Sequence, residues 1–194
     1  MKKTIIVGCC ACAAAVAVTT QAAAEPAFTT GKPSAGLRLQ YGIDLEDHDT
    51  DLNFYGLGFG ARGGYTLDFG LYVGGQFEYF FGGSEEAAGI EISASVWQLQ
   101  AEAGYDIGLG PTFALRPQLG LGLAGISAEV CIDDMMGGQA CGDDSETDFA
   151  LSPGALAMYD VGPVFLTGEL RFNMIMAEES ANALFIGVGA GMPF

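Results

Sequence analysis

Residues 183–194 read Ala-Leu-Phe-Ile-Gly-Val-Gly-Ala-Gly-Met-Pro-Phe and alternate strictly between two kinds of side chain. Apolar residues occupy the even positions from Leu184 to Phe194, while glycine occupies most of the odd positions. Because a β-strand turns successive side chains to opposite faces, one face of this segment is apolar and the other is nearly bare. The segment ends on an aromatic residue with no polar tail after it. This pattern predicts a strand that closes a barrel in lipid.

The first 24 residues have the pattern of a secretory signal peptide. Lys2 and Lys3 precede an uncharged run from Ile5 to Val18, and small residues up to Ala24 supply a cleavage site. Cys9 also suggests a lipoprotein signal, but the apolar stretch before it is too short for one. We therefore expect cleavage after Ala24 and a protein that leaves the cytoplasm.

The rest of the chain divides into a short periplasmic N-terminal segment, 25–33, and a barrel domain, 34–194. None of its apolar stretches reaches the roughly 20 residues of a transmembrane helix. Its only cysteines are Cys131 and Cys141, so an oxidising compartment predicts a disulfide between them. One lysine and four arginines stand against 24 carboxylates, which argues against nucleic acid as a partner.

Alternation and turn residues together predict eight antiparallel strands, each long enough to cross a bilayer at a tilt. These strands cover residues 34–44, 53–66, 70–82, 91–106, 112–126, 148–160, 163–176 and 182–194. The connections at 66–70, 106–112 and 160–163 are short, whereas those at 44–52, 82–90, 127–147 and 176–181 are mostly longer and polar. The fold class is therefore all-β, an up-and-down transmembrane barrel with turns at one end and loops at the other.

Aromatic residues mark two rims of the predicted barrel. Tyr65, Tyr105 and Tyr159 each precede a short turn on the apolar parity, where an amphipathic ring sits at the water boundary. Tyr55 and Trp97 lie earlier in the strands of Tyr65 and Tyr105, respectively. At about 3.3 Å per residue and about 45° tilt, Trp97 lies roughly 19 Å in height from Tyr105, and Tyr55 lies roughly 23 Å from Tyr65. Both values are near the apolar height of about 25 Å that is expected of such a barrel. We expect Trp97 and Tyr55 in the outer girdle at the loop end.

The fourth predicted strand, 91–106, is less regular than the others. Its odd positions are apolar or aromatic from Trp97 to Tyr105. Towards the loop end, however, the same odd positions hold Glu91, Ser93 and Ser95. Either this end rises clear of the lipid, or a bulge shifts the register near Ser95. The sequence does not choose between the two.

The parity opposite the apolar one carries all four arginines of the mature chain together with polar partners. An eight-stranded barrel is only just wide enough to be filled by side chains, so we expect these groups to pair. The predicted lumen network consists of Arg38, Arg62, Glu78, Glu102, Arg116, Glu169 and Arg171. Such a network predicts a plugged lumen. Inward glycines leave room for water, however, and a narrow polar pore is the alternative.

The longer loops are acidic and contain no lysine or arginine. Asp47, Asp49 and Asp51 have a spacing that can offer oxygens to Ca²⁺, but without the glycine and glutamate of an EF-hand. A solvated acidic loop is the simpler interpretation, with no metal or other cofactor. The predicted disulfide would brace the 127–147 loop or shape it as a binding epitope.

Nothing in the sequence locates a catalytic site. His48 is the only histidine and lies among acids, so no Ser-His or Cys-His pair is supported. The lumen glutamates are better explained by structural pairing with arginine. We therefore expect a protein that is not an enzyme.

The signal peptide, the eight strands, the alternation of short and long connections, the inward Arg and Glu and the terminal Phe194 together resemble the small eight-stranded outer-membrane barrels of the OmpA and OmpX type. The resemblance covers residues 34–194 and is architectural. It implies a place in the lipid of the bacterial outer membrane. It also implies insertion by the outer-membrane assembly machinery, which in this family recognises a last strand ending in phenylalanine, here Phe194. Pro193 departs slightly from the usual pattern and weakens the final ladder position.

Two classes of function stay open. The first is a non-enzymatic surface protein whose rigid barrel presents acidic loops for envelope integrity, adhesion or the binding of an extracellular partner, as in the family that it resembles. The second is a narrow pore or transporter for small solutes. Conductance in planar bilayers separates the two.

Overall fold

The computed structural model describes residues 27–45, 53, 55–87, 90–133, 139–176 and 181–194. Ten strands lie within these residues. They are β1 Lys32–Asp44, β2 Gly56–Thr66, β3 Leu71–Phe80, β4 Ser84–Ala87, β5 Ile90–Tyr105, β6 Ile107–Gly108, β7 Phe113–Asp133, β8 Gln139–Asp160, β9 Phe165–Ile175 and β10 Ala181–Pro193. Across these described ranges, no helix is long and apolar enough to span a membrane.

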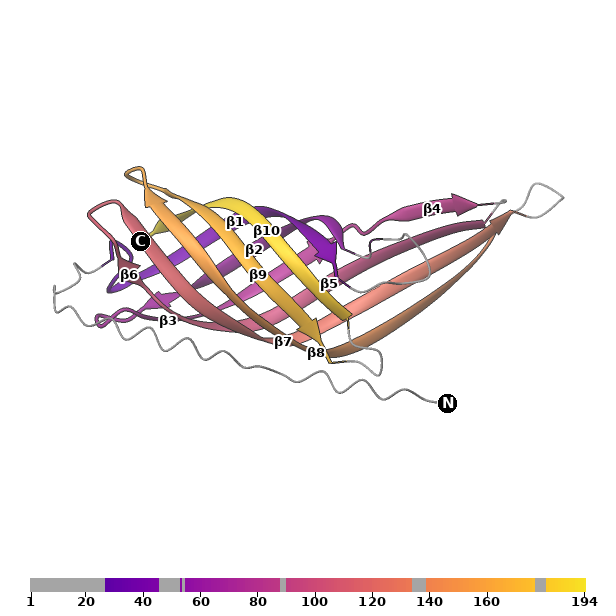
Figure 1. Cartoon of the computed structure of the whole chain (residues 1–194), viewed down its shortest axis with the longest axis horizontal. Coiled ribbons are helices and arrows are strands. Elements are labelled where there is room, and N and C mark those ends of the chain that lie inside the picture. The colour runs from indigo at the N-terminus through magenta and orange to yellow at the C-terminus, as the bar shows by residue number, and fades with distance from the viewer. Residues whose placement is uncertain (1–26, 46–52, 54, 88–89, 134–138, 177–180) are drawn as a thin grey trace.

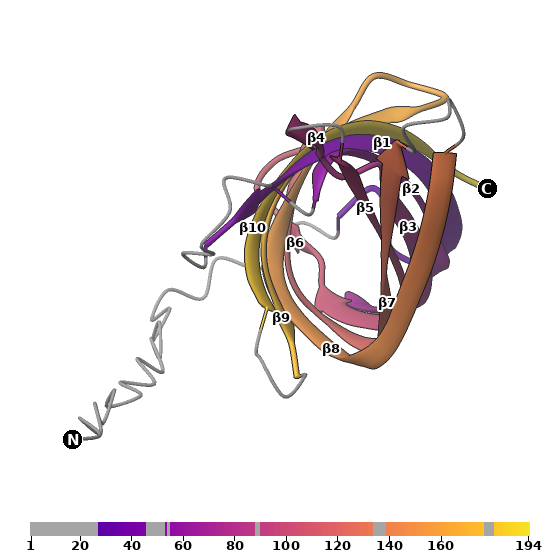
Figure 2. The ribbon, with the colours of Figure 1, turned by 90° about the vertical axis from the view of Figure 1, so that its right-hand side faces the viewer.

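The strands form a single closed antiparallel sheet (Figure 1). The last strand, β10, pairs with β1, and β5 pairs with β7, which closes the circle. The two shortest strands extend others, since β4 follows β3 along β5 and β6 follows β5 along β7. The result is an eight-stranded up-and-down barrel, viewed along its length in Figure 2. The predicted fold class is confirmed.

The register of the sheet fixes the tilt of the strands. A circuit of paired residues that starts at Lys32 passes around the barrel and returns to β1 at Gly42, ten residues further along. Such an offset over eight strands requires a tilt of about 45°. A barrel of this geometry has an interior that side chains can just fill.

A bulge lies between β3 and β4, opposite the strand that the sequence left ambiguous. The stretch from β3 to β4 carries one more residue than the stretch of β5 that it faces. The extra residue falls near Gly82, whose φ of 64° is a conformation that glycine adopts without strain. The pairing of β5 with β7 is uninterrupted past Ser95. The fourth strand is therefore regular there, and the bulge belongs to its neighbour.

The predicted loop at 127–147 is wrong, because most of it is β-structure. β7 continues to Asp133, β8 begins at Gln139, and the two pair without interruption along this length. In Figure 1 this hairpin and the ends of β4 and β5 project beyond the rest of the barrel. The sequence misled because a strand beyond the lipid can carry polar side chains on both faces, so its alternation between apolar and polar residues is lost.

The tyrosines before the short turns lie on the outer face, but Tyr55 does not. Tyr65, Tyr105 and Tyr159 are exposed there, whereas Tyr55 is 1% exposed and lies inside the barrel. Its predicted place in the outer girdle is therefore wrong. Gly56, with a φ of 58°, separates Tyr55 from the alternation of β2, so the parity of Tyr55 no longer predicts the face it occupies.

Candidate functional site: the lumen and the long hairpin

The middle of the lumen is a charged layer that centres on Glu78. Glu78 is fully buried, and both Arg38 and Arg171 donate hydrogen bonds to its carboxylate. The distance from Arg171 Nη2 to Glu78 Oε2 is 2.5 Å, and Arg38 Nη1 donates to Glu169 Oε2 at 2.9 Å. These side chains come from β1, β3 and β9, so the contacts tie together separate parts of the wall.

Arg62 and Glu102 extend the same layer. Arg62 Nη2 lies 2.6 Å from Glu169 Oε2 and 3.7 Å from Glu102 Oε1. Gln118 Nε2 donates a further hydrogen bond to Glu169 Oε1 at 2.8 Å. The layer thus contains three arginines and three glutamates, and its formal charges balance, as a low-dielectric interior requires.

A relay of uncharged groups crosses the lumen beside the charged layer. Gln76 Nε2 donates to Gln100 Oε1 at 2.6 Å, and Gln100 Nε2 donates to Ser152 Oγ at 2.8 Å. Ser152 Oγ in turn donates to Asn173 Oδ1 at 2.6 Å. Amide and hydroxyl groups suit this position because each both donates and accepts hydrogen bonds.

Arg116 stands apart from the network in which the sequence placed it. Its Nε and Nη2 donate to the two carboxylate oxygens of Asp106, the second at 2.8 Å. Thr66 Oγ1 and Thr29 Oγ1 donate to the same carboxylate at 2.9 and 2.5 Å. The Tyr72 ring centroid lies 3.6 Å from the guanidinium carbon, which is a cation–π distance. Sequence reasoning missed Asp106 because the residue stands where the predicted strand 91–106 meets the predicted connection 106–112, although its parity matches the lumen residues of that strand.

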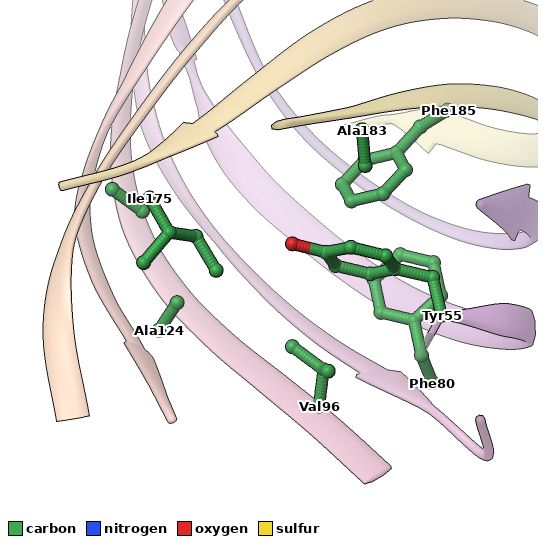
Figure 3. Packing of buried hydrophobic residues seen from close by; sticks show 8 residues of the cluster. Tyr55, Phe80, Val96, Ala124, Ile175, Ala183 and Phe185 are labelled. Carbon is green, nitrogen blue, oxygen red and sulfur yellow. The ribbon is translucent and has the colours of Figure 1, made fainter. Parts of the chain in front are cut away.

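An apolar layer closes the loop end of the lumen (Figure 3). Tyr55 packs edge-on against Phe80 and Phe185, with ring centroids 5.4 and 5.1 Å apart. The other buried members of this layer are Val96, Ala124, Ala150, Ile175 and Ala183. The sequence did not predict this layer, because its members are scattered along a parity that is otherwise glycine and polar residues.

A second apolar layer closes the short-turn end. Its buried members are Ala27, Ala114, Leu156, Met158 and Phe165. The Phe28 ring packs on Phe165, with centroids 5.8 Å apart. Part of the predicted N-terminal segment, 25–33, is therefore built into the mouth of the barrel. Near this end, a cavity of about 20 Å³ lined by three arginines has room for about one water molecule.

Inward glycines leave the space that the arginines occupy. A Cβ atom at Gly60 would lie 2.9 Å from Arg38 Nε, and one at Gly154 would lie 2.9 Å from Arg171 Cβ. A methyl group at Gly60 would force Arg38 to move, and one at Gly154 would also lie 2.7 Å from Leu170 O, so the backbone of β9 would have to move as well. Glycine on the inner face of one strand thus makes room for a bulky inner side chain of the neighbouring strand.

One edge of the long hairpin has no strand partner among the residues that the structure describes. β8 pairs with β9 only from Ala150 onwards, and Phe149 O accepts a hydrogen bond from Met176 N at 2.8 Å. Within the described ranges, no strand pairs with residues 139–148 on the side away from β7. The side chains of Asp144 and Glu146 are exposed along this edge. With respect to the described strands, the edge therefore presents unpaired N–H and C=O groups beside carboxylates.

The remaining candidate residues lie at the hairpin, at the C-terminus and outside the described ranges. Cys131 and Cys141 face each other across the hairpin, with sulfur atoms 2.11 Å and Cα atoms 4.1 Å apart. Phe194 is exposed, and its N–H donates to Pro33 O at 3.0 Å. The candidate Ca²⁺ ligands lie outside the described residues: Asp47, Asp49 and Asp51.

Solved outer-membrane proteins share this architecture. A major outer membrane protein of Thermus thermophilus superposes with a TM-score of 0.62 at 12% identity, over 84% of this chain and 99% of that one. Ail, the attachment invasion locus protein of Yersinia pestis, gives 0.56 at 16% identity, over 84% and 97%. Neisserial surface protein A gives 0.52 at 19% identity, over 84% and 96%. At these identities the likeness concerns the fold alone.

Sequence comparison leads to the same kind of protein. Residues 10–194 match the profile of the family described as "Outer membrane protein beta-barrel domain". No curated protein matches the chain in sequence. The family is one of structural, adhesion or porin-type proteins that are generally not enzymes. The match covers nearly the whole chain and agrees with the closed barrel, so this chain belongs to the outer membrane protein beta-barrel family and is a bacterial outer-membrane protein.

Proposed function

We propose that this protein is a non-enzymatic surface barrel with a filled lumen, which presents the acidic edge of β8 to an extracellular partner. In outer-membrane barrels the short turns face the periplasm and the longer connections face outwards, so the long hairpin is extracellular. The observation that carries the proposal is that, in the part of the chain that the structure describes, no strand pairs with residues 139–148 on the side away from β7. A strand edge of this kind can add an extended segment of another chain through backbone hydrogen bonds.

The distribution of charge selects the kind of partner. All four arginines of the mature chain lie in the lumen, paired with Glu78, Glu102, Asp106 and Glu169. The longer loops and the 127–147 segment contain no lysine or arginine. Opposite charge both steers association and suppresses wrong partners, so the partner that fits is a cationic extended polypeptide. A structure of Ail with the polyanionic heparin analogue sucrose octasulfate is known, and the acidic hairpin here disfavours such a ligand.

The test measures binding of a peptide of alternating lysine and valine to the refolded barrel in detergent. We expect salt-dependent binding that Asp144→Asn/Glu146→Gln weakens about three- to tenfold, or roughly 0.3 to 0.7 kcal/mol per charge. The matched control, Asp68→Asn/Asp160→Asn, removes two carboxylates from periplasmic turns and should leave binding unchanged. Equal loss in both double variants, or tighter binding of sulfated glycan than of the peptide, contradicts the proposal.

The layered lumen disfavours the alternative of a pore. Water would have to pass an aromatic layer, a balanced charged layer and a second apolar layer, each of them buried. We therefore infer negligible conductance of the purified barrel in planar bilayers. A stable and reproducible single-channel current would favour the narrow pore instead.

The outer face and the last strand indicate how the barrel reaches its membrane. Leu37, Val188 and Leu166 are at least half exposed on the outer face, which suits contact with lipid. We propose that Phe194 is the signal that the outer-membrane assembly machinery recognises. Deletion of Phe194 should lower the heat-modifiable, folded fraction in cells but not the refolding of the purified protein in detergent. A loss in both would assign Phe194 a role in barrel stability instead.

A further inference from the structure

The tip of the β7–β8 hairpin gathers two sulfur atoms and a carboxylate. Glu129 and Cys131 lie two residues apart on β7, and Cys141 of β8 pairs directly with Cys131. The two Sγ atoms and a carboxylate oxygen of Glu129 all lie within 4.8 Å of one another. Glu129 and Cys141 are exposed, and Cys131 is half-buried, so solvent reaches the group.

We propose that this cluster is a redox-controlled site for a thiophilic divalent cation such as Zn²⁺. In the oxidised protein the two sulfurs are bonded to each other. When an external thiol reduces the disulfide, Cys131, Cys141 and Glu129 become three ligands of one cation, and water completes the coordination.

The geometry suits a tetrahedral zinc site. Bond lengths of about 2.3 Å to sulfur and about 2.0 Å to oxygen place a tetrahedral S–O pair about 3.5 Å apart and an S–S pair about 3.8 Å apart. Cys131 Sγ already lies 3.7 Å from Glu129 Oε1. Reduction leaves the two sulfurs free to separate by side-chain rotation, while the paired strands keep the two Cα atoms 4.1 Å apart.

The composition of the surrounding sequence favours a cation over an anion. Six carboxylate residues lie within residues 127–147 of the sequence. The 127–147 segment contains no lysine or arginine. A concentration of carboxylates raises the local affinity for a divalent cation, and the two thiolates select a soft one.

The reaction balances without a further reactant. Two equivalents of external thiol are oxidised to their disulfide, the bond between Cys131 and Cys141 breaks, and two electrons and two protons pass to the cysteines. Binding of the cation then releases those two protons. The disulfide bond and the bound cation are therefore two alternative cross-links between β7 and β8.

The experiment uses the refolded mature barrel, reduced with dithiothreitol and freed of excess reductant without oxygen. Titration with Co²⁺ should produce thiolate-to-cobalt absorption in the reduced protein and none in the oxidised protein, and Zn²⁺ should displace the cobalt. Cys131→Ser/Cys141→Ser should abolish the band. Glu129→Gln should weaken Zn²⁺ binding about tenfold, whereas the matched Glu146→Gln, which removes a nearby carboxylate that is not a ligand, should weaken it less than about twofold.

Heat-modifiable gel mobility shows that each variant is folded before it is titrated. A reduced, folded barrel that gives no thiolate band overturns the proposal. So does a Glu129→Gln variant that binds Zn²⁺ as tightly as Glu146→Gln, because the third ligand would then be wrongly assigned.

Discussion

Replacement of Glu78 by glutamine should unbalance the charged layer at the centre of the lumen. Glu78 is fully buried and accepts hydrogen bonds from both Arg38 and Arg171. In the variant, Arg38 retains a close ion pair, with 2.9 Å between its Nη1 and Glu169 Oε2. Arg171 retains only a distant ion pair, with 3.9 Å between its Nε and Glu169 Oε1. Removal of one partner of a buried ion pair typically costs about 3 to 5 kcal/mol, because it leaves an uncompensated buried charge. We expect a loss of unfolding free energy of that size.

Reversible urea unfolding in lipid vesicles, followed by the fluorescence of the single tryptophan, measures this loss. Glu146→Gln is the matched control, since the same chemical change at an exposed site should shift the free energy by no more than about 0.5 kcal/mol. Glu78→Gln combined with Arg171→Met removes both charges and should be less destabilising than the sum of the single variants by at least about 1 kcal/mol. A loss below about 1 kcal/mol for Glu78→Gln, or strict additivity in the double variant, would refute the reasoning.

Three further variants probe the other layers by the same unfolding assay. Gly60→Ala places a methyl group 2.9 Å from Arg38 Nε and should cost about 1 to 3 kcal/mol by overpacking; an unchanged midpoint would show that the arginine moves freely. Thr29→Val removes the hydroxyl that donates to Asp106 and should cost about 1 to 3 kcal/mol, and the same loss for Thr30→Val, at a half-buried neighbour, would make the effect non-specific. Tyr55→Ala empties the centre of the aromatic layer and should cost about 3 to 5 kcal/mol, an expectation that fails if the loss matches that of an exposed tyrosine such as Tyr65→Ala.

The alternation of the sequence was sufficient to predict the barrel and its inward arginines. Period two is a property of the strand itself, so Leu184 to Phe194 identifies its two faces without knowledge of any neighbour. The same rule placed Arg38, Arg62, Arg116 and Arg171 on the inner parity, and the structure has three of them buried and the fourth half-buried. The rule failed where the backbone leaves strand geometry, as at Tyr55 beside the left-handed Gly56.

Which inward residues meet was decided only by the closed sheet. Arg116 pairs with Asp106 and not with the central glutamates, because barrel tilt and register place it at a different height. The two apolar layers, the space at Gly60 for Arg38 and the long hairpin that replaces a predicted loop also follow from relations between strands. By itself, then, the sequence determined a lipid-facing barrel with a polar interior, because alternation is local. The partners inside it, and the edge of β8 that no described strand covers, were settled by the tertiary structure, because they depend on the register between strands.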